Sequence, residues 1–226
     1  MAESYLGTDS CGISVCSDRQ METAIRFCKE NRCQLSMHAM GGRAIERVVD
    51  RAAKEEKWND GPEPYVRVEH ITDPSADSVR KAARKGIGFV TQPIFLYAEI
   101  ESYLNNLGPA WMKRCYPVRD LLDSQVKLCF STDAPATSWA VPSDPFPNLK
   151  GAVTRRAWDG TDCGQEQAVD IETAIILYTK EAAQMAGFDR LGQLREGYKA
   201  DFLLLDRDIL EIPAEQIDQC RWNRLI

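Results

Sequence analysis

Histidine is scarce in this sequence, and the cysteines lack the spacing of a structural zinc site. Of 226 residues only two are histidines, His38 and His70, and no pair of the eight cysteines has the C-x-x-C spacing. A zinc finger or ribbon needs four closely spaced ligands of these types, so both are excluded. Disulfide frameworks are typical of short secreted chains, and we therefore expect most of these cysteines to be reduced core residues.

Long basic runs and long apolar runs are also missing. The net charge is −6 and no run of lysine and arginine exceeds two residues, which argues against nucleic acid and anionic membranes as partners. No apolar stretch approaches the roughly 20 residues of a membrane-spanning helix. Residues 1–12 contain neither the basic nor the apolar part of a secretion signal. We therefore expect a cytoplasmic protein.

The sequence does contain a regular alternation of strand-like and helix-like segments. Short runs rich in apolar residues predict strands at 33–38, 65–70, 87–91 and 126–130. Helical spacing predicts helices after Ser17, over 43–57, over 73–85 and over 117–124. Ser17 and Gln20 form a capping-box pattern, and Gly86 predicts the end of the third helix. Such alternation indicates a parallel sheet with helical crossovers.

The remaining segments do not follow this alternation. Residues 94–116 are rich in aromatic side chains and are predicted as a long connection, which either covers a binding site as a lid or packs beneath a loop. A helix is predicted over 170–186, with Gly187 as its stop. The tail 192–210 is expected to contain turns followed by a strand at 200–206.

Polar side chains with metal-binding chemistry lie where three predicted strands end. His38 ends the first strand, His70 ends the second, and Asp133 follows the fourth, while Gln92 follows the third. In barrels of alternating strands and helices, the reactive residues lie at the carboxyl ends of the strands. Two imidazoles and a carboxylate can bind zinc and leave a position for water. A single histidine at a strand end is more often a hydrogen-bonded structural residue, so the metal site is one of two interpretations.

Five sequence blocks, in order, resemble the amidohydrolase superfamily and within it the YtcJ-like branch, called amidohydrolase 3. His38 to Gly41 with Arg43 and Ala44 resembles its H-A-x-G-D-R-A block, and Arg67 to His70 resembles its R-I-E-H. The blocks that resemble its later motifs are Thr91 to Pro93, Ser131 to Pro135, and a closing signature from Glu172 through Leu191, Gly192, Glu196, Gly197 and Ala200 to Phe202.

This resemblance implies an α/β fold, the carboxyl-terminal half of a (β/α)8 barrel of the TIM type with strands five to eight. Residues 1–190 would form the half barrel, and 191–226 would be a remnant of the family's small β-sandwich domain with a divergent tail. His38, His70 and Asp133 would bind a divalent metal of the zinc class, with Asp133 also acting as general base and acid. Gln92 and Thr132 would contact substrate. The implied reaction is hydrolysis of carbon–nitrogen bonds other than peptide bonds, in small amides or N-substituted formamides.

Several family features are missing from this chain. The H-x-H pair that follows the family's first barrel strand has no counterpart, because both histidines are already assigned. Gly42 replaces the usual aspartate of the first block, and residues 219–226 differ from the family's final strand. The alternative is therefore a non-catalytic, truncated barrel that needs a partner chain, either a second copy in a homo-oligomer or a complementing amino-terminal half. Half a barrel would expose two sheet edges and apolar surface.

Other side chains near the predicted site have less specific roles. Arg67 and Glu69 lie on the opposite strand face from His70, and a structural ion pair is the expected role. Lys127, Cys129 and Asp133 share one face, which leaves the apolar face of the fourth strand for helices. Trp139 is a candidate for the border of the pocket.

Overall fold

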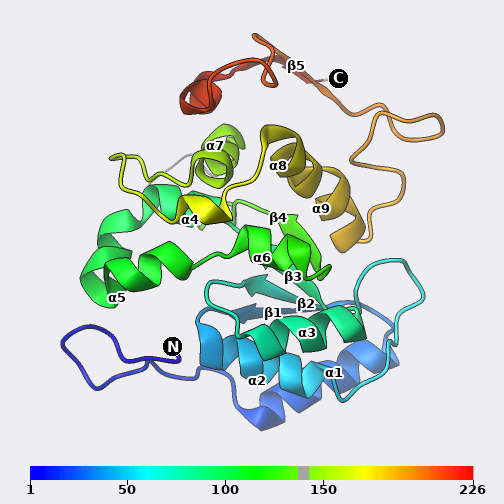
Figure 1. The fold of residues 1–226 in the computed structure, drawn as a ribbon. Coiled ribbons are helices and arrows are strands. Elements are labelled where there is room, and N and C mark those ends of the chain that lie inside the picture. The colour runs from blue at the N-terminus through cyan, green and yellow to red at the C-terminus, as the bar shows by residue number, and fades with distance from the viewer. Residues whose placement is uncertain (137–142, 226) are drawn as a thin grey trace.

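Four parallel strands form the central sheet of the chain. The computed structural model describes residues 1–136 and 143–225 (Figure 1). The strands lie in chain order, and they are β1 (Leu35–Ala39), β2 (Val66–His70), β3 (Gly88–Thr91) and β4 (Lys127–Phe130). Each neighbouring pair is parallel. The predicted parallel sheet with helical crossovers is therefore confirmed, and its place in a half barrel stays a prediction.

The helices that precede and follow the first two strands cover one face of this sheet. They are α1 (Asp18–Glu30), α2 (Gly42–Ala52) and α3 (Ala76–Lys85). Ser17 and Gln20 make both hydrogen bonds of the predicted capping box at the start of α1. Gly86 ends α3 in the left-handed region with φ 65°, where a side chain would be strained. α2 ends at Ala52, before the predicted end at residue 57.

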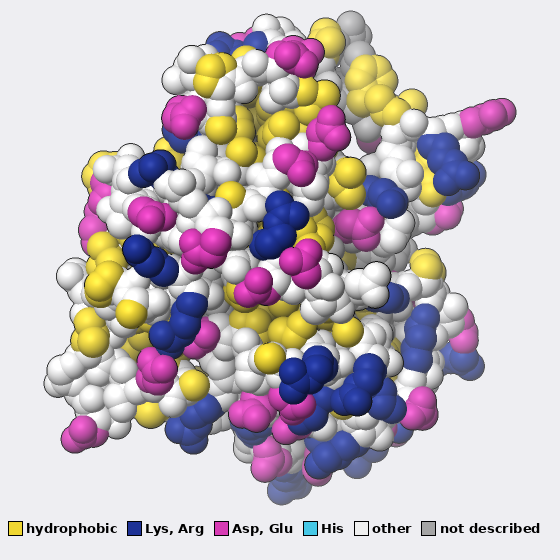
Figure 2. Space-filling view, in the orientation of Figure 1, with side chains coloured by type: hydrophobic (Ala, Val, Ile, Leu, Met, Phe, Trp, Pro, Cys, Tyr) yellow, Lys and Arg dark blue, Asp and Glu magenta, His cyan; other side chains and the backbone are white. Residues whose placement is uncertain are grey.

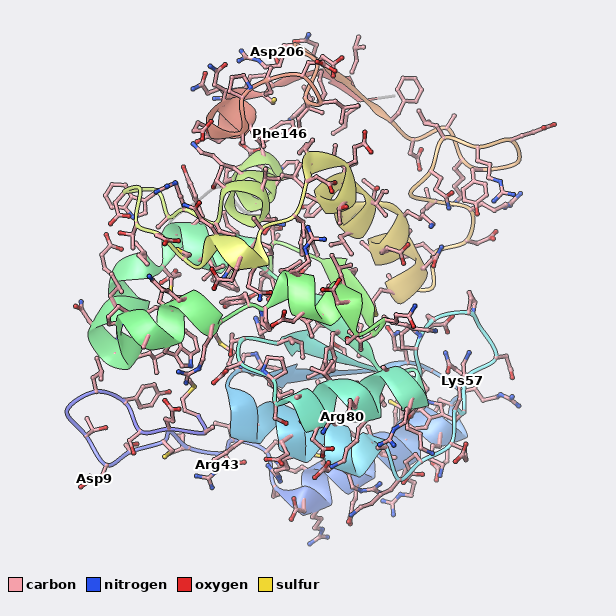
Figure 3. The ribbon with its side chains drawn as sticks, in the orientation of Figure 1. Asp9, Arg43, Lys57, Arg80, Phe146 and Asp206 are labelled. Atoms are coloured by element: carbon pink, nitrogen blue, oxygen red, sulfur yellow. The ribbon has the colours of Figure 1, made fainter. Side chains whose placement is uncertain are left out.

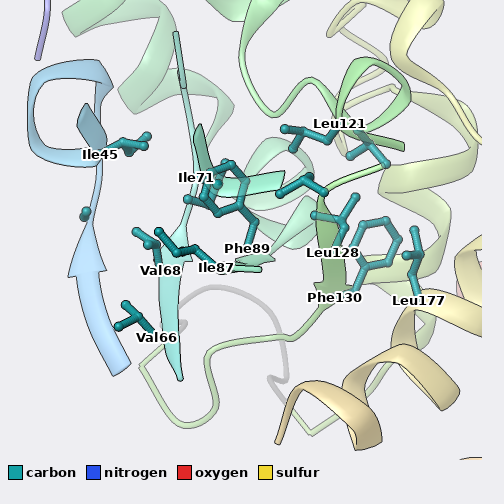
Figure 4. Close-up of a cluster of buried hydrophobic side chains, with 14 of the residues drawn as sticks. Ile45, Val66, Val68, Ile71, Ile87, Phe89, Leu121, Leu128, Phe130 and Leu177 are labelled. Atoms are coloured by element: carbon teal, nitrogen blue, oxygen red, sulfur yellow. The ribbon is translucent and has the colours of Figure 1, made fainter. Parts of the chain in front are cut away.

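The main core lies between the sheet and its covering helices. Val66, Val68, Phe89, Leu128 and Phe130 alternate along their strands and are all buried in one cluster with Ile45, Leu121 and Leu177 from the helices (Figure 4). Complete burial of such a side chain contributes about 1.5–3 kcal/mol. The predicted division of β4 into an apolar helix-facing side and a more polar side is thus confirmed for Leu128 and Phe130.

The opposite face of the sheet is partly covered and partly polar. On β3 and β4, Val90 and Cys129 are buried in a small cluster with Met185. On β2 this face carries Arg67 and Glu69, whose side chains are 30% and 20% exposed. The expectation that a half barrel leaves a broad apolar face exposed is therefore wrong for β3 and β4, because Met185 of α9 (Lys180–Met185) packs there.

The aromatic segment 94–116 is helical, so its prediction as a long connection is wrong. It forms α4 (Pro93–Ala98) and α5 (Ile100–Arg114), which are followed by α6 (Val118–Asp123). Gly108, at φ 83° and ψ 168°, interrupts α5 just before Pro109. Tyr103, Trp111 and Tyr116 are buried in a second cluster with Leu96 and Ile100. Packing in this cluster accounts for Tyr103, Trp111 and Tyr116, and the alternative of a lid stays a prediction.

The segment after Asp133 adds helices beside the fourth strand. They are α7 (Phe146–Thr154), the 3-10 turn η1 (Gln165–Gln167), and α8 (Ile171–Tyr178) followed by α9. The helix predicted over 170–186 is thus present but broken at Thr179, where φ is −116° and ψ is −79°. α7 begins with a proline in its first turn, which is compatible with helix initiation.

The last residues form a small antiparallel unit. β5 (Leu203–Leu205) pairs with β6 (Trp222–Leu225), and the 3-10 helix η2 (Ala214–Gln219) lies between them. Asp218 anchors η2 by accepting a hydrogen bond from Lys150 Nζ at 2.8 Å and from Tyr97 Oη at 3.1 Å. The predicted strand at 200–206 is confirmed in its central residues. The boundary at 190/191 stays a prediction.

The outer surface carries charges of both signs. Lys and Arg side chains alternate with Asp and Glu over α1 to α3 on the face shown in Figure 2. Lys57, in the connection between α2 and β2, and Arg80 on α3 point outward into solvent (Figure 3). Within the described ranges 1–136 and 143–225, no helix is long and apolar enough to span a bilayer. All eight cysteines are free thiols, five of them buried.

Candidate functional site

The predicted site residues are collected at the carboxyl end of the sheet. His70 is the last residue of β2, and its register partners are Ala39 on β1 and Thr91 on β3. Thr91 in turn pairs with Phe130, the last residue of β4. Because the four parallel strands end at the same level, His38, Gln92 and Asp133 lie at the edge where His70 lies. The sequence prediction of a shared strand end is confirmed.

The two imidazoles are in direct contact. The ring centroids of His38 and His70 are 4.5 Å apart, and the ring planes are inclined by 69° in an edge-to-face arrangement. His70 is buried, with 6% of its surface exposed, whereas His38 is exposed. The ring of Phe95, from α4, lies 5.8 Å from that of His70. One imidazole is therefore buried, with the Phe95 ring on one side, and the other faces solvent.

The surroundings of His70 favour its neutral form. Burial lowers the pKa of His70, and the neighbouring His38 lowers it further, while Asp133, Glu69 and Gln92 act in the opposite direction. The carboxylate of Asp133 is therefore close enough to influence His70 electrostatically. A neutral imidazole is the form that binds a metal ion, because the protonated ring has no free nitrogen lone pair.

Three backbone positions of the site lie in the left-handed region. His70 has φ 82°, the adjacent Ile71 has φ 43°, and Asp133 has φ 57°. Residues other than glycine rarely adopt such values, and strained positions of this kind cluster at functional sites. The hydroxyl of Thr91 donates to the carbonyl oxygen of His70 at 3.1 Å and fixes the end of β2.

Gln92 and Thr132, the two predicted substrate-contacting residues, are buried and make hydrogen bonds within the chain. Gln92, with 1% exposure, donates from Nε2 to Ser131 Oγ at 2.9 Å. Thr132 is 6% exposed. Burial raises the pKa of Tyr178 on α8, and a side-chain hydrogen bond with Thr132 opposes that rise. Thr132 therefore has a partner within the chain, and its predicted contact with substrate stays a prediction, as does that of Gln92.

Two buried polar atoms at this edge, His70 Nδ1 and Gln92 Oε1, make no hydrogen bond of good geometry with the described residues. A side-chain hydrogen bond with Gln92 nevertheless raises the pKa of His70, so these two side chains lie close together. An imidazole nitrogen and a carboxamide oxygen are both groups that can bind a metal ion or a polar ligand. Two imidazoles with a nearby carboxylate are donors of the zinc class, so these residues fit part of such a centre.

The donor set is nevertheless incomplete in the part of the chain that the structure describes. No group of three or more His, Cys, Asp and Glu side chains within residues 1–136 and 143–225 is arranged to hold a metal ion. The assignment of His38, His70 and Asp133 as ligands, and of Asp133 as the catalytic base, therefore stays a prediction. Trp139, the candidate for the pocket border, lies outside the described residues.

The expected ion pair on the inner sheet face is present. Arg67 Nε and Glu69 Oε1 are 2.8 Å apart, and Ser36 Oγ donates to the same carboxylate oxygen at 2.6 Å. These contacts tie β1 to β2 beside the histidines. Glu69 is the register partner of His38, which places the ion pair next to the exposed imidazole.

Sequence reasoning missed some contributors to the site. Phe95 was considered only as part of a connection, and the buried Thr72 and Thr91 were not singled out. A helix start at Pro93 was readable from the preference of proline for the first helical turn, and it would have brought Phe95 toward the strand ends. No comparable signal in the sequence identifies Thr72, because its contacts depend on the backbone conformation of the residues before it.

Comparison with known proteins identifies relatives. The family model described as the amidohydrolase family matches residues 1–222. The putative amidohydrolase YtcJ of Bacillus subtilis is 25% identical over 210 residues, which is 91% of this chain and 38% of that protein. The sequence therefore spans about two fifths of the length of this relative.

Solved structures agree with this comparison. An uncharacterised metal-dependent hydrolase from Pyrococcus horikoshii matches with a TM-score of 0.78 and 25% identity, over 95% of this chain and 42% of that chain. Protein TrzN of Arthrobacter aurescens, an atrazine chlorohydrolase solved with zinc, matches with a TM-score of 0.58 and 17% identity, over 96% of this chain and 47% of that one. The last likeness shows a shared fold alone.

Proposed function

Since this chain belongs to the amidohydrolase family, we propose that it supplies half of the active site of a metal-dependent hydrolase. The reaction is hydrolysis of a carbon–nitrogen bond other than a peptide bond, in a small amide or N-substituted formamide. The observation that carries the proposal is the contact between the His38 and His70 rings, 4.5 Å apart at the carboxyl end of the sheet. Relatives described as metal-dependent hydrolases support it.

Each residue has a separate part in this mechanism. His38 and His70 would hold a divalent metal of the zinc class, and burial keeps His70 in the neutral form that can bind it. When bound, such a metal lowers the pKa of a water ligand and polarises a carbonyl group. The Asp133 carboxylate takes a proton from the attacking water and returns it to the leaving nitrogen. Gln92 Oε1 and the Thr132 hydroxyl orient the substrate, and Phe95 limits water around His70.

A second reading is favoured by the incomplete donor set in the described part of the chain. In that reading the chain is a non-catalytic barrel fragment that completes its fold and its site only with another chain. That partner is a second copy of this chain or a complementing amino-terminal half. Ser36 and His38 of the outer strand β1, with Glu69 of the neighbouring strand β2, form the polar surface that such a partner would cover.

The proposed reaction is tested by measuring amine release from a panel of small amides and N-substituted formamides in the presence of zinc. Asp133→Asn keeps the shape of the side chain but removes the base, and we expect the rate to fall at least about 100-fold. The control is Asp77→Asn, a matched change on the exposed start of α3, which leaves the rate unchanged. Equal rates for wild type and Asp133→Asn would contradict the proposed function, and no amine release from any substrate would contradict catalysis by this chain without a partner.

A further inference from the structure

The loops that follow β1 and β2 touch each other beside the two histidines. The backbone N–H of Gly41 donates to the Thr72 hydroxyl oxygen at 2.9 Å, and this hydrogen bond is buried. Gly42 and Asp73, the residues that follow Gly41 and Thr72, are also close. A Cβ placed on Gly42 would lie 2.9 Å from the carbonyl oxygen of Asp73. The Gly41-Gly42 pair therefore lets the loop after His38 approach the loop after His70.

Thr72 is itself fixed from the other side. It has 1% of its surface exposed, and its carbonyl oxygen accepts a hydrogen bond from Tyr116 N at 2.7 Å. The Tyr116 carbonyl accepts in turn from the buried Arg155 guanidinium at 3.0 Å. The side chain of Thr72 thus bonds the loop after β1, and its backbone bonds the junction between α5 and α6.

His70 and Ile71, the two residues before Thr72, need such support. His70 and Ile71 both have positive φ, at 82° and 43°, and Ile71 is β-branched and completely buried. A β-branched residue in this region is strained and persists only where the surrounding contacts fix it. The conformation that aims His70 at His38 therefore depends on what holds Thr72 in place.

We propose that Thr72 is a positioning residue whose hydroxyl ties the loop after β1 to the loop after β2 and thereby sets the spacing of His38 and His70. The inference rests on the proposed function, in which both imidazoles bind one metal ion. Thr72 acts through the two histidines and touches neither the metal nor the substrate.

The test uses the fact that the chain has only two histidines. In the full chain labelled at histidine, without added metal, the contact between the His38 and His70 rings gives an inter-ring NOE cross-peak. Thr72→Val keeps the β-branched shape but removes the acceptor for Gly41 N, and we expect the cross-peak to be lost while the far-ultraviolet circular dichroism is kept. Thr72→Ser keeps the hydroxyl and is expected to retain the cross-peak.

Either of two results would overturn the proposal. One is a cross-peak of wild-type intensity in Thr72→Val, and the other is its loss in Thr72→Ser as well. If Thr72→Val does not fold, hydrogen exchange at the Gly41 amide of the wild type decides the question. Protection of that amide is expected, and exchange as fast as in an unstructured loop would refute the hydrogen bond on which the proposal depends.

This experiment is independent of the outcome for metal binding. The ring contact is read without metal, so a chain that binds no zinc can still show the predicted difference between Thr72→Val and Thr72→Ser. A chain that binds zinc but shows no such difference would refute the role of Thr72 and leave the proposed function standing.

Discussion

At the scale of single residues, the site depends on a few buried polar groups whose partners come from distant parts of the chain. His70 is held by Thr91 on the next strand, and its ring meets His38 from the preceding strand. The positions of His38 and His70 were predictable, because parallel strands end at a common edge. The left-handed conformations of His70 and Asp133 were not, because no local sequence pattern marks them.

The residue with the largest predicted effect on stability is Arg155, which is completely buried. Its guanidinium donates to four backbone carbonyls, those of Cys115, Tyr116, Cys163 and Gly164. Arg155→Met removes all four donors. The Cys115 and Cys163 carbonyls then keep no donor among the described residues, whereas Tyr116 still accepts from Val118 N and Gly164 from Gln167 N. We expect a loss of more than about 3 kcal/mol in the free energy of unfolding. Urea unfolding followed by circular dichroism measures this loss.

The adjacent Arg156 provides the matched control. Its side chain is exposed, and its guanidinium donates to the Gly160 carbonyl at 3.2 Å. Arg156→Met should change the free energy of unfolding by less than about 0.5 kcal/mol. Equal effects of the two substitutions would show that the buried guanidinium does not stabilise this part of the fold.

At the scale of elements, the caps were predictable and the aromatic helices were not. The capping box before α1 and the Gly86 stop of α3 follow directly from local side-chain and backbone preferences. α4 and α5 were missed because Gly108 and Pro109 interrupt the pattern, and because burial of Tyr103 and Trp111 in a separate cluster outweighs local propensity. α7 was missed because the prolines at its start are typical of loop sequences.

The α8 helix gives a prediction on stability and pH. The Asp170 side chain caps it by accepting from Thr173 N at 2.7 Å. Asp170→Ala should lower the free energy of unfolding by about 1 kcal/mol at pH 7, whereas Asp170→Asn, which also caps well, should cost less. Urea unfolding at neutral pH separates the two variants, and an equal loss in both would contradict the capping role.

The charge of Asp170 adds a pH dependence. The hydrogen bond to the Thr173 backbone lowers the pKa of Asp170 in the folded chain. Because the folded-state pKa is lowered, the stabilisation is present above the unfolded value of about 3.9 and is lost as the pH falls through the folded value. The stability difference between wild type and Asp170→Asn should therefore shrink below about pH 4, and a constant difference would contradict the assignment.

At the scale of the whole molecule, the four-stranded sheet ends in β1 on one side and β4 on the other. The chain covers about two fifths of the length of relatives such as YtcJ, at 38%. The two-stranded unit of β5 and β6 also carries exposed apolar side chains, among them Leu204 at 55% and Trp222 at 58%. These surfaces support the proposal that another chain completes the fold.

If that other chain is a second copy, the thermal unfolding midpoint should rise with protein concentration, because association stabilises only the folded state. Calorimetry over a 100-fold range of protein concentration would detect this rise. Each tenfold increase in concentration stabilises a folded dimer by about 1.4 kcal/mol. A midpoint independent of concentration contradicts pairing of two copies and favours a complementing amino-terminal half.

The central claim is that His38 and His70 together bind a divalent metal, and metal content after dialysis against zinc tests it most directly. We predict about one zinc per chain in the wild type, a loss in His70→Ala, and no loss in the control Cys33→Ser, which removes an exposed thiol. No zinc in the wild type, or equal zinc in wild type and His70→Ala, would contradict the claim that these two histidines form a metal site.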